Sequence, residues 1–422
     1  MSPVTRQYVL AFLIATVFCT VSLSAFWGRV SPDLLATWMA AEAFANGDYG
    51  LIYPPAADLF EVRPPDEWWV SLADRGYTGP VLPYIYPPLW AALLAPATGW
   101  VSYSVFQEIT LVINHAALII MILAAWRAAT PSTSPAMYLG LALLLLCASP
   151  VGALGLVQNQ PQILVSCLTV LAIERAKNGS GYAAGAALGL AAALKLSPIF
   201  LLPAICVLGR SRPILAGFVV VGGGAGVLSI ILAGWPLHRT FLDLIATISA
   251  TSVISGASWT LTALWAQLGD WQSLLFLETI PGSGREDGWW IRQRPVMLSV
   301  GLTALACGVA AGAAIALKRG WGILAIPAAL SAFALAAPIA WSFHYLAPVV
   351  FLPAILPRLG LGAGLATLVA TGLLISFPVL SLAAALPYPP LPDQALGTLG
   401  VALMAVVFLA LAKADPAGTK SD

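Results

Sequence analysis

The chain alternates long apolar runs with short polar breaks, and this pattern predicts membrane-spanning helices. The first run, from about Tyr8 to Trp27, is long enough to cross a hydrocarbon core about 30 Å thick. Further runs predict membrane segments near 88–100, 104–126, 136–156, 160–173, 182–197, 198–209, 213–234, 296–317, 321–341, 345–357, 361–386 and 396–412. We therefore expect an all-α, polytopic transmembrane helical bundle with about 12 membrane segments, counting short ones.

Two longer polar stretches, 28–86 and 235–294, interrupt this pattern. We expect them to be outer, periplasmic loops of one integral-membrane domain that comprises residues 1–422. The first loop is predicted to contain short interfacial helices, one of them ending near 68–69. The second predicts an interfacial helix over 237–254 and a polar tip at 281–290.

The main helix of the first loop has clear end signals. Ser31 can cap it, Pro32 suits its first position and Gly47 can end it. The residues between these signals are apolar on nearly all sides, and about 15 residues are too few to span a membrane. We therefore expect this helix to lie in the membrane interface.

Basic residues orient the segments, because short cytoplasmic loops collect Lys and Arg. In one arrangement, 88–100 does not cross fully and 182–209 is a hairpin that turns at 195–198. In the other, 88–100 crosses and 182–209 is one long helix. The first is preferred, because it places these basic groups in the cytoplasm with both termini: Arg127, Glu174-Arg175-Ala176-Lys177 and Gly209-Arg210-Ser211-Arg212.

Composition supports the membrane class and excludes others. Of the 422 residues, 60% are hydrophobic and 9% are charged, whereas a soluble chain carries about 25% charged residues. The net charge of +1, without a basic block, gives no reason to expect nucleic acid. The five cysteines lack metal-ligand spacing, and the sequence contains no Walker-type glycine loop, Asp-x-Asp pair, His-Glu-x-x-His or Gly-x-Ser-x-Gly. Nucleotide hydrolysis, a protein-bound metal and a cofactor are therefore not expected.

Asp33 is the first candidate for chemistry. It lies in the first turn of the helix that begins at Pro32, where the helix dipole favours an ionised carboxylate. Either it is a general base at the membrane surface, or it only stabilises the start of the helix. Trp38 and Glu42 can line the same pocket, although Trp38 is also typical of an interface anchor.

Three further features stand out because polar groups at membrane depth are costly without partners. Gln158-Asn159-Gln160-Pro161-Gln162 is either a sugar-binding amide cluster or an ordinary polar turn. Lys195 either neutralises a phosphate or snorkels to the interface, and the helix break at Pro198 favours the first role. His344 either binds a phosphate oxygen or a hydroxyl, or is a structural residue. His115 is expected to be an interhelical hydrogen-bond partner.

In their order along the chain, these residues resemble the polytopic GT-C glycosyltransferases. In particular, the chain resembles glycosyltransferase family 87, which includes polyprenol-phosphate-mannose-dependent mannosyltransferases. Two departures occur: Val157-Gln158 replaces the usual glycine before the amide motif, and Phe343-His344 holds one histidine where a pair is common. The resemblance rests on Asp33 with Trp38-Met39-Ala40-Ala41, Tyr86-Pro87-Pro88-Leu89-Trp90, Gln158-Asn159-Gln160, Leu194-Lys195-Leu196-Ser197-Pro198 and Pro338-Ile339-Ala340-Trp341-Ser342-Phe343-His344.

The resemblance implies a GT-C bundle in a bacterial inner membrane, with its active site facing the periplasm. It implies transfer of a hexose, with mannose expected, from a polyprenyl-phosphate donor to a hydroxyl of a glycolipid or glycan acceptor, without a cofactor. Asp33 would be the general base of an inverting reaction. The residues expected to bind substrate around it are Lys195, His344, Gln158, Asn159, Gln160, Trp38 and Tyr86.

Two other functions remain open at this point. One is a GT-C transferase for another sugar, such as a pentose. The other is a lipid or solute transporter that uses Lys195 and His344 as relay or substrate groups. A transporter of this kind typically has an inverted repeat with paired broken helices. The sequence shows no such repeat.

Overall fold

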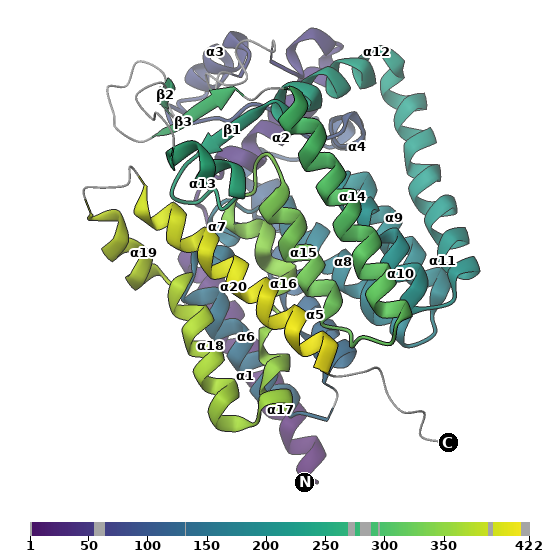
Figure 1. Ribbon diagram of the computed structural model, residues 1–422. Coiled ribbons are helices and arrows are strands. Elements are labelled where there is room, and N and C mark those ends of the chain that lie inside the picture. Colours follow the sequence, from purple (N-terminus) through teal and green to yellow (C-terminus); the bar gives the residue numbers. More distant parts are fainter. Residues whose placement is uncertain are drawn as a thin grey trace.

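The apolar runs form helices that pack side by side in a bundle, as Figure 1 shows for the computed structural model of the chain. The structure describes residues 2–54, 64–130, 132–268, 275–278, 288–293, 296–386 and 391–414. The longest helices are α1 (Pro3–Phe26), α5 (Tyr103–Ala129), α12 (Gly224–Ser249), α14 (Val296–Lys318) and α20 (Pro392–Ala414).

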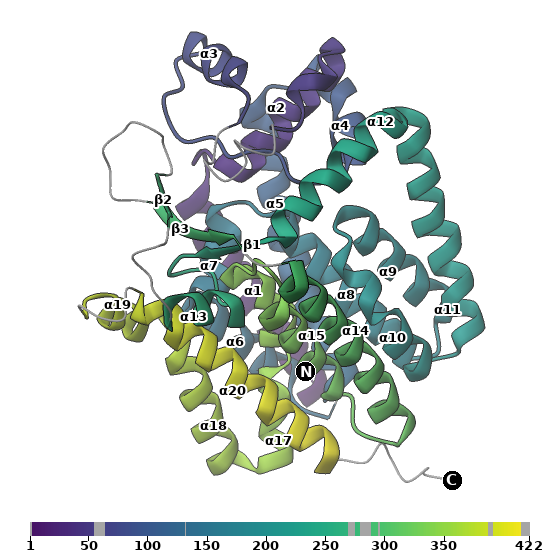
Figure 2. The same cartoon turned by 45° about the horizontal axis from the view of Figure 1, so that its top comes forward.

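Shorter helices complete the bundle. In Figures 1 and 2, α2, α3 and α4 gather at one end of the molecule, near the upper bend of α12. The shorter helices are α2 (Pro32–Asn46), α3 (Asp66–Asp74), α4 (Pro88–Thr98), α6 (Pro135–Cys147), α7 (Pro150–Val157), α8 (Pro161–Lys177), α9 (Gly181–Leu194), α10 (Leu202–Leu208), α11 (Ser211–Phe218), α13 (Leu261–Leu268), α15 (Ala325–Ala336), α16 (Leu346–Val349), α17 (Leu356–Leu359), α18 (Leu361–Leu374) and α19 (Phe377–Ala384).

The multi-pass helical class is confirmed, but the expected number of membrane segments is not. Helices α6 and α7 form a pair bent by 75°, which counts as at most one span in addition to the seven long helices named at the end of this paragraph. The apolar helices α4, α9, α10 and α15 have at most 14 residues and reach no more than about 21 Å, because Pro and Gly interrupt the runs. In the described part of the chain, seven helices are long and apolar enough to cross: Pro3–Phe26, Tyr103–Ala129, Ser211–Ser249, Val300–Lys318, Ser342–Leu359, Leu361–Ala384 and Pro392–Ala414.

Helix α2 has the predicted ends but not the predicted surroundings. The Ser31 side chain accepts a hydrogen bond from the Leu34 N–H, Pro32 is the first helical residue, and Gly47 adopts the left-handed conformation at the end. All residues from Leu34 to Ala41 are buried. Side chains of α3, α4 and α12 cover the helix, so protein and not lipid shields its apolar surface.

The second short helix of the first polar stretch begins, and does not end, near 68–69. It is α3, and Pro65 at its N-cap position together with Asp66 and Glu67 in its first turn define its start. Residues 55–63, which precede it, lie outside the described part of the chain. The prediction placed the end of the helix too early, because the two tryptophans suggested a membrane boundary.

The second polar stretch departs from the all-α class. Helix α12 bends at Gly234, where φ is 73°, and ends at Ser249, so the helix expected over 237–254 is too long. Strand β1 (Thr251–Ile254) follows, and its β-branched residues favour a strand. Strand β3 (Gly288–Gln293) pairs antiparallel with β1 and with β2 (Leu275–Glu278), giving the order β1-β3-β2. The predicted polar tip lies mostly outside the described residues.

Residues 181–209 form the hairpin of the preferred arrangement, not one long helix. Helix α9 ends just before Lys195, and the 3₁₀ turn η3 (Ser197–Leu201) and α10 return the chain. The two ends of the segment meet, since a Cβ placed on Gly181 would lie 3.5 Å from the carbonyl oxygen of Arg210. Lys195 therefore lies at the turn, one helix length from the basic end.

Glycines bring α9 close to α11. A Cβ on Gly185 would lie 1.9 Å from the Ile214 carbonyl oxygen, and one on Gly217 would lie 2.2 Å from the Tyr182 carbonyl oxygen. Both distances are far shorter than van der Waals contact, so a larger residue at either glycine must push the backbones apart. This contact therefore fixes α9, the helix that ends just before Lys195.

We expect Gly185→Ala to lower the free energy of unfolding by about 1–3 kcal/mol, because the added methyl group overlaps the α11 backbone. Gly226→Ala on α12 is the matched control, since no described atom lies within 4 Å of its added Cβ. Alanine there also favours the helix. The midpoint of thermal unfolding in detergent measures both variants. Equal midpoints would contradict the close contact of α9 with α11.

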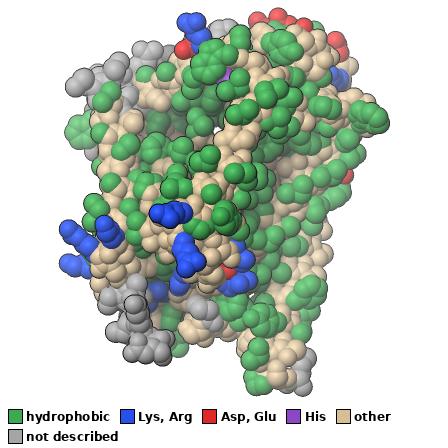
Figure 3. Space-filling model, turned by 90° about the vertical axis from the view of Figure 1, so that its right-hand side faces the viewer, with side chains coloured by type: hydrophobic (Ala, Val, Ile, Leu, Met, Phe, Trp, Pro, Cys, Tyr) green, Lys and Arg blue, Asp and Glu red, His purple; other side chains and the backbone are tan. Residues whose placement is uncertain are grey.

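Charge divides the molecule into two ends. In Figure 3, acidic side chains lie at the top, most Lys and Arg side chains lie toward the bottom, and apolar side chains cover the surface between. At the basic end, Arg127 forms an ion pair with buried Glu174 at 3.1 Å. Lys177 and Arg358 donate hydrogen bonds to the carbonyl oxygens of Ala128 and Ala129 at the end of α5. The basic end is thus also a packed helix junction.

Candidate functional site

The polar turn between α7 and α8 lies at the centre of the candidate site. Among the described residues, Asn159 is the one non-glycine residue with positive φ, 44°, and asparagine tolerates that conformation better than most residues. Pro161 then begins α8, with Gln160 as its N-cap residue. This sharp reversal sends neighbouring amide side chains toward different elements.

Gln160 joins Asp33 to Tyr86. Its Nε2 donates a hydrogen bond to Asp33 Oδ2, and its Oε1 accepts one from the Tyr86 hydroxyl at 3.1 Å. Since the oxygen accepts from tyrosine, the NH₂ group faces the carboxylate. Tyr86 is held in turn by Tyr53, whose hydroxyl donates to the Tyr86 carbonyl oxygen at 2.7 Å. Gln160 therefore orients the Asp33 carboxylate.

The start of α2 is bonded to the same turn through Ser31. Its hydroxyl donates to the Gln158 carbonyl oxygen, and its N–H donates to Gln107 Oε1 at 3.0 Å. Its carbonyl oxygen accepts a bond of 2.9 Å from the Tyr103 hydroxyl. These bonds join α2, α5 and the amide turn, and they place Asp33 beside the turn.

Asn159 belongs to this scaffold. Its Nδ2 donates to the Gln107 carbonyl oxygen, and its Oδ1 accepts from Asn114 Nδ2, both at 2.8 Å. The residue is only 2% exposed. Both polar atoms of its amide are thus used by α5, so the structure gives Asn159 a structural contact where substrate binding was expected.

Lys195 and His344 meet although they are 149 positions apart. Lys195 Nζ lies 2.5 Å from His344 Nε2 and 3.0 Å from Gln162 Oε1. His344 Nδ1 lies 3.1 Å from the Trp341 carbonyl oxygen, which needs a donor, so Nε2 accepts from the ammonium. An ammonium carries three N–H groups, and these two bonds leave one for a further acceptor.

Backbone contacts hold the segments that carry this pair. The indole N–H of Trp90 donates to the carbonyl oxygen of Leu194, next to Lys195, at 3.3 Å. The turn η6 (Ser342–Tyr345) carries His344, and the Ser342 N–H donates to the Ala257 carbonyl oxygen at 2.7 Å. The second polar stretch therefore supports the histidine, and no motif in the sequence indicates that contact.

Asp33 and Lys195 are close enough to influence each other. Desolvation by the surrounding protein raises the pKa of the Asp33 carboxyl to about 6, against the Gln160 hydrogen bond and the Lys195 charge, which lower it. Desolvation also raises the pKa of the Tyr86 phenol well above its ordinary value, and the nearby Asp33 charge adds to that rise. At neutral pH, Asp33 is therefore ionised and can accept a proton.

Exposure separates the expected site residues into two groups. Trp38, Asn159 and Gln160 are each 2% exposed, so they are nearly covered by protein and act by holding other residues in place. Those that a ligand can reach are partly exposed: Asp33, Tyr86, Gln158, Lys195 and His344.

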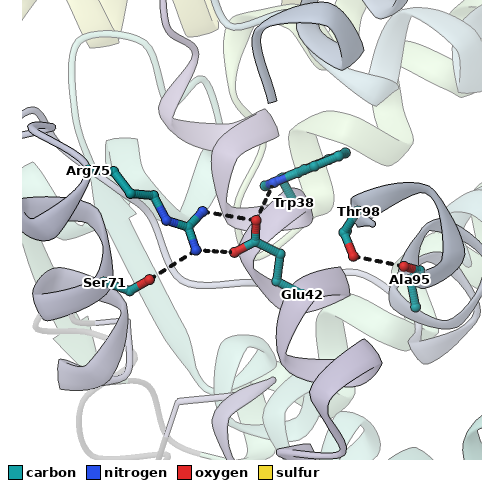
Figure 4. Close-up of polar contacts among 6 residues, drawn as sticks. All are labelled: Trp38, Glu42, Ser71, Arg75, Ala95 and Thr98. Atoms are coloured by element: carbon teal, nitrogen blue, oxygen red, sulfur yellow. Dashed lines mark hydrogen bonds and ion pairs between the residues drawn. The ribbon is translucent and has the colours of Figure 1, made fainter. Parts of the chain in front are cut away.

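Trp38 and Glu42 form a separate cluster, shown in Figure 4. The Trp38 indole N–H donates to Glu42 Oε1 at 2.7 Å, and Arg75 binds both oxygens of Glu42, at 2.9 and 2.8 Å. The Trp38 ring packs against Phe106 of α5, with centroids 5.1 Å apart. Glu42 and Arg75 line an open hollow of about 380 Å³, and Glu42 lies about 13 Å along α2 from Asp33. Trp38 thus stabilises α2 and α3, and the pocket that it was expected to share with Asp33 is not formed by these contacts.

Sequence reasoning missed several partners of the site. Gln162 was visible in the amide motif but was not singled out as the partner of Lys195. The roles of Ser31 and Gln107 depend on contacts between distant segments. Trp90 had a signal, because it ends the Tyr-Pro-Pro-Leu-Trp segment that also contains Tyr86.

Comparison with known families gives one match. The family model described as glycosyltransferase family 87 matches residues 84–322, more than half of the chain. The matched stretch includes Tyr86, the amide turn and Lys195, whereas Asp33 and His344 lie outside it. No curated protein matches the chain.

Proposed function

The chain belongs to glycosyltransferase family 87, and we propose that it transfers a hexose from a polyprenyl phosphate to a hydroxyl group of a glycolipid or glycan. By its family it is a membrane glycosyltransferase, so the transporter alternative falls away. We propose mannose as the sugar, and we place the reaction at the acidic, outer end of the bundle, on the periplasmic side of a bacterial inner membrane.

Asp33 acts as the general base in this proposal. The acceptor hydroxyl attacks the anomeric carbon from the side opposite the phosphate, which inverts the configuration. The new bond joins the acceptor oxygen to the anomeric carbon, the bond from that carbon to the phosphate oxygen breaks, and the hydroxyl proton passes to Asp33. Gln160 holds the carboxylate in one orientation through its hydrogen bond to Oδ2.

Lys195 stabilises the leaving group. The polyprenyl phosphate departs with the electron pair of the broken bond, so negative charge grows on its oxygens. The third N–H of the Lys195 ammonium is directed to one of these oxygens, while His344 and Gln162 hold the other two. A fixed cation in a poorly hydrated site stabilises such charge more strongly than it would in water.

The proposal is supported most by one observation: a single short segment binds both Asp33, the proposed base, and Lys195, the proposed cation. Gln160 binds the carboxylate and Gln162 binds the lysine, so the start of α8 holds a base and a cation at a fixed separation. Inverting transfer needs these two charges on opposite sides of the sugar. The bilayer adds to the rate, because it holds the lipid-linked donor in place.

The donor class is tested with purified protein, polyprenyl-phosphate-linked radiolabelled mannose and a membrane lipid extract. We expect label to pass to a product in the lipid extract without added nucleotide sugar or metal ion. Polyprenyl-phosphate arabinose in a parallel reaction tests the pentose alternative. Transfer from a nucleotide sugar alone, or from the pentose donor alone, would contradict the proposal.

A further inference from the structure

Helix α20 carries a buried amide, Gln394, close to its start. The residue is 0% exposed, and an amide buried in this way is costly unless it is hydrogen-bonded. Its Nε2 donates to the carbonyl oxygen of Ser258 at 2.8 Å and to Thr398 Oγ1 at 3.0 Å. Its Oε1 accepts from Gln267 of α13. Both polar atoms of the amide are used within the protein, so Gln394 acts on other parts of the chain and not on a substrate.

The start of α20 lies directly against the segment 256–260, which Gln394 contacts. A Cβ placed on Gly256 would lie 2.1 Å from Asp393 Oδ2, and one placed on Gly397 would lie 2.3 Å from Trp259 Nε1. These distances are far shorter than van der Waals contact, so the glycines let the segment and α20 approach this closely. Helix α20 therefore fixes the position of the segment.

The same segment is bonded in turn to the residues that precede His344. The Trp259 N–H donates to the Ala340 carbonyl oxygen at 2.8 Å, and Ser258 pairs with Trp341 in an antiparallel bridge. The carbonyl oxygen of Trp341 lies 3.1 Å from His344 Nδ1, which donates to it. The ring of His344 is thus oriented by a carbonyl group whose position depends on the segment beside α20.

We propose that Gln394 is a positioning residue of the transfer reaction. It holds Ser258, and Ser258 holds Trp341 through the antiparallel bridge. Trp341 then orients His344, which accepts from Lys195. This inference goes beyond the proposed function and rests on it for the role of the lysine. A displaced histidine would move the ammonium, and an error of about 1 Å in the position of such a group costs on the order of 100-fold in rate.

The kinetic test uses Gln394→Met, which keeps the length of the side chain and removes its donor and its acceptor. We expect kcat to fall about 10-fold while KM for polyprenyl-phosphate mannose changes less than about twofold, because Lys195 acts mainly in the transition state. On the residual activity of His344→Ala, we expect the same substitution to bring no further loss, since its effect passes through the histidine. A merely structural defect would lower the rate by the same factor in both backgrounds.

A second readout needs no donor. The chain contains three histidines, so protein labelled with ¹⁵N at histidine gives few ring signals in an NMR spectrum. The signals that disappear in His344→Ala belong to His344. We expect Gln394→Met to shift these signals and to leave those of His115 and His238 in place, because only the His344 ring depends on the bonded segment.

Gln7→Met is the matched control for the loss of an amide elsewhere. Gln7 accepts a hydrogen bond from Ser134, and it lies about 28 Å along α1 from the last residue of that helix, Phe26. We expect wild-type kcat and unshifted His344 signals. Thermal unfolding midpoints show whether each variant is folded. If Gln394→Met does not fold, Gln394→Asn, whose amide is one carbon shorter, takes its place in both tests.

Three results would overturn the inference. These are a wild-type kcat in the Gln394 variant, an equal loss in the His344→Ala background, and unshifted ring signals of His344. A wild-type protein that uses no polyprenyl-phosphate sugar would overturn the proposed function instead. The ring signals would then still show whether Gln394 positions His344.

Discussion

Replacement of Asp33 by asparagine is expected to lower hexose transfer by at least about 100-fold, because the reaction would lose its general base. Asparagine has nearly the same shape as aspartate, and its side-chain oxygen can still accept the hydrogen bond from Gln160. The fold and the start of α2 should therefore survive. The rate of label transfer from polyprenyl-phosphate mannose measures the effect.

The pH profile gives a second readout of the same residue. Desolvation raises the pKa of the Asp33 carboxyl to about 6, and only the ionised form can take a proton. For wild type, kcat/KM should therefore fall as the pH drops below about 6 and level off above it. In Asp33→Asn, the small remaining rate should not change in that range, because the titrating group is absent.

Glu42→Gln is the matched control for this prediction. Glu42 is a second carboxylate on the same helix, but its partners are Trp38 and Arg75, and it lies about 13 Å from Asp33 along the helix. We expect this variant to transfer hexose at the wild-type rate, with the wild-type pH profile. If Asp33→Asn retained full activity while Glu42→Gln lost it, the base would have to be sought in the hollow beside Arg75.

Local chemistry explains which parts of the fold could be predicted from the sequence. The ends of α2 follow from Ser31, Pro32 and Gly47, because capping depends on neighbouring residues only. The prediction that His115 joins two helices is also confirmed, since its Nε2 lies 2.8 Å from Ser22 Oγ of α1. The sheet was missed because β1 follows α12 after one residue, and its partner β3 lies far along the chain.

Some residues of the candidate site could also be predicted from the sequence, and others could not. Asp33 stood out by its place in the first turn of α2. Lys195 and His344 stood out because titratable side chains are rare among apolar residues, where they are costly without partners. The roles of the amides could not be predicted, since they depend on partners from distant segments. Gln160, for example, is 127 positions from Asp33. Only the folded chain shows that Gln160 faces the base and that Gln162 faces the lysine.

Replacement of Lys195 by methionine is the second change expected to abolish most activity. We expect kcat to fall by about 100- to 1,000-fold, which is the usual cost of losing one group that stabilises charge in the transition state. Methionine fills much the same space but carries no charge, so His344 and Gln162 lose their shared donor. The loss should appear mainly in kcat, because charge on the phosphate grows as the bond to the sugar breaks.

Two variants make the Lys195 prediction specific. Lys318→Met removes an exposed lysine at the end of α14, and it should leave transfer unchanged. Lys195→Arg restores the charge, but the planar guanidinium does not reproduce the compact contacts of Nζ with both His344 and Gln162, so its kcat should lie between those of wild type and Lys195→Met. If Lys195→Met kept the wild-type kcat, the lysine would merely snorkel toward the membrane surface. The stabilising cation would then have to come from another side chain, and the pairing of base and lysine across the amide turn would not explain catalysis.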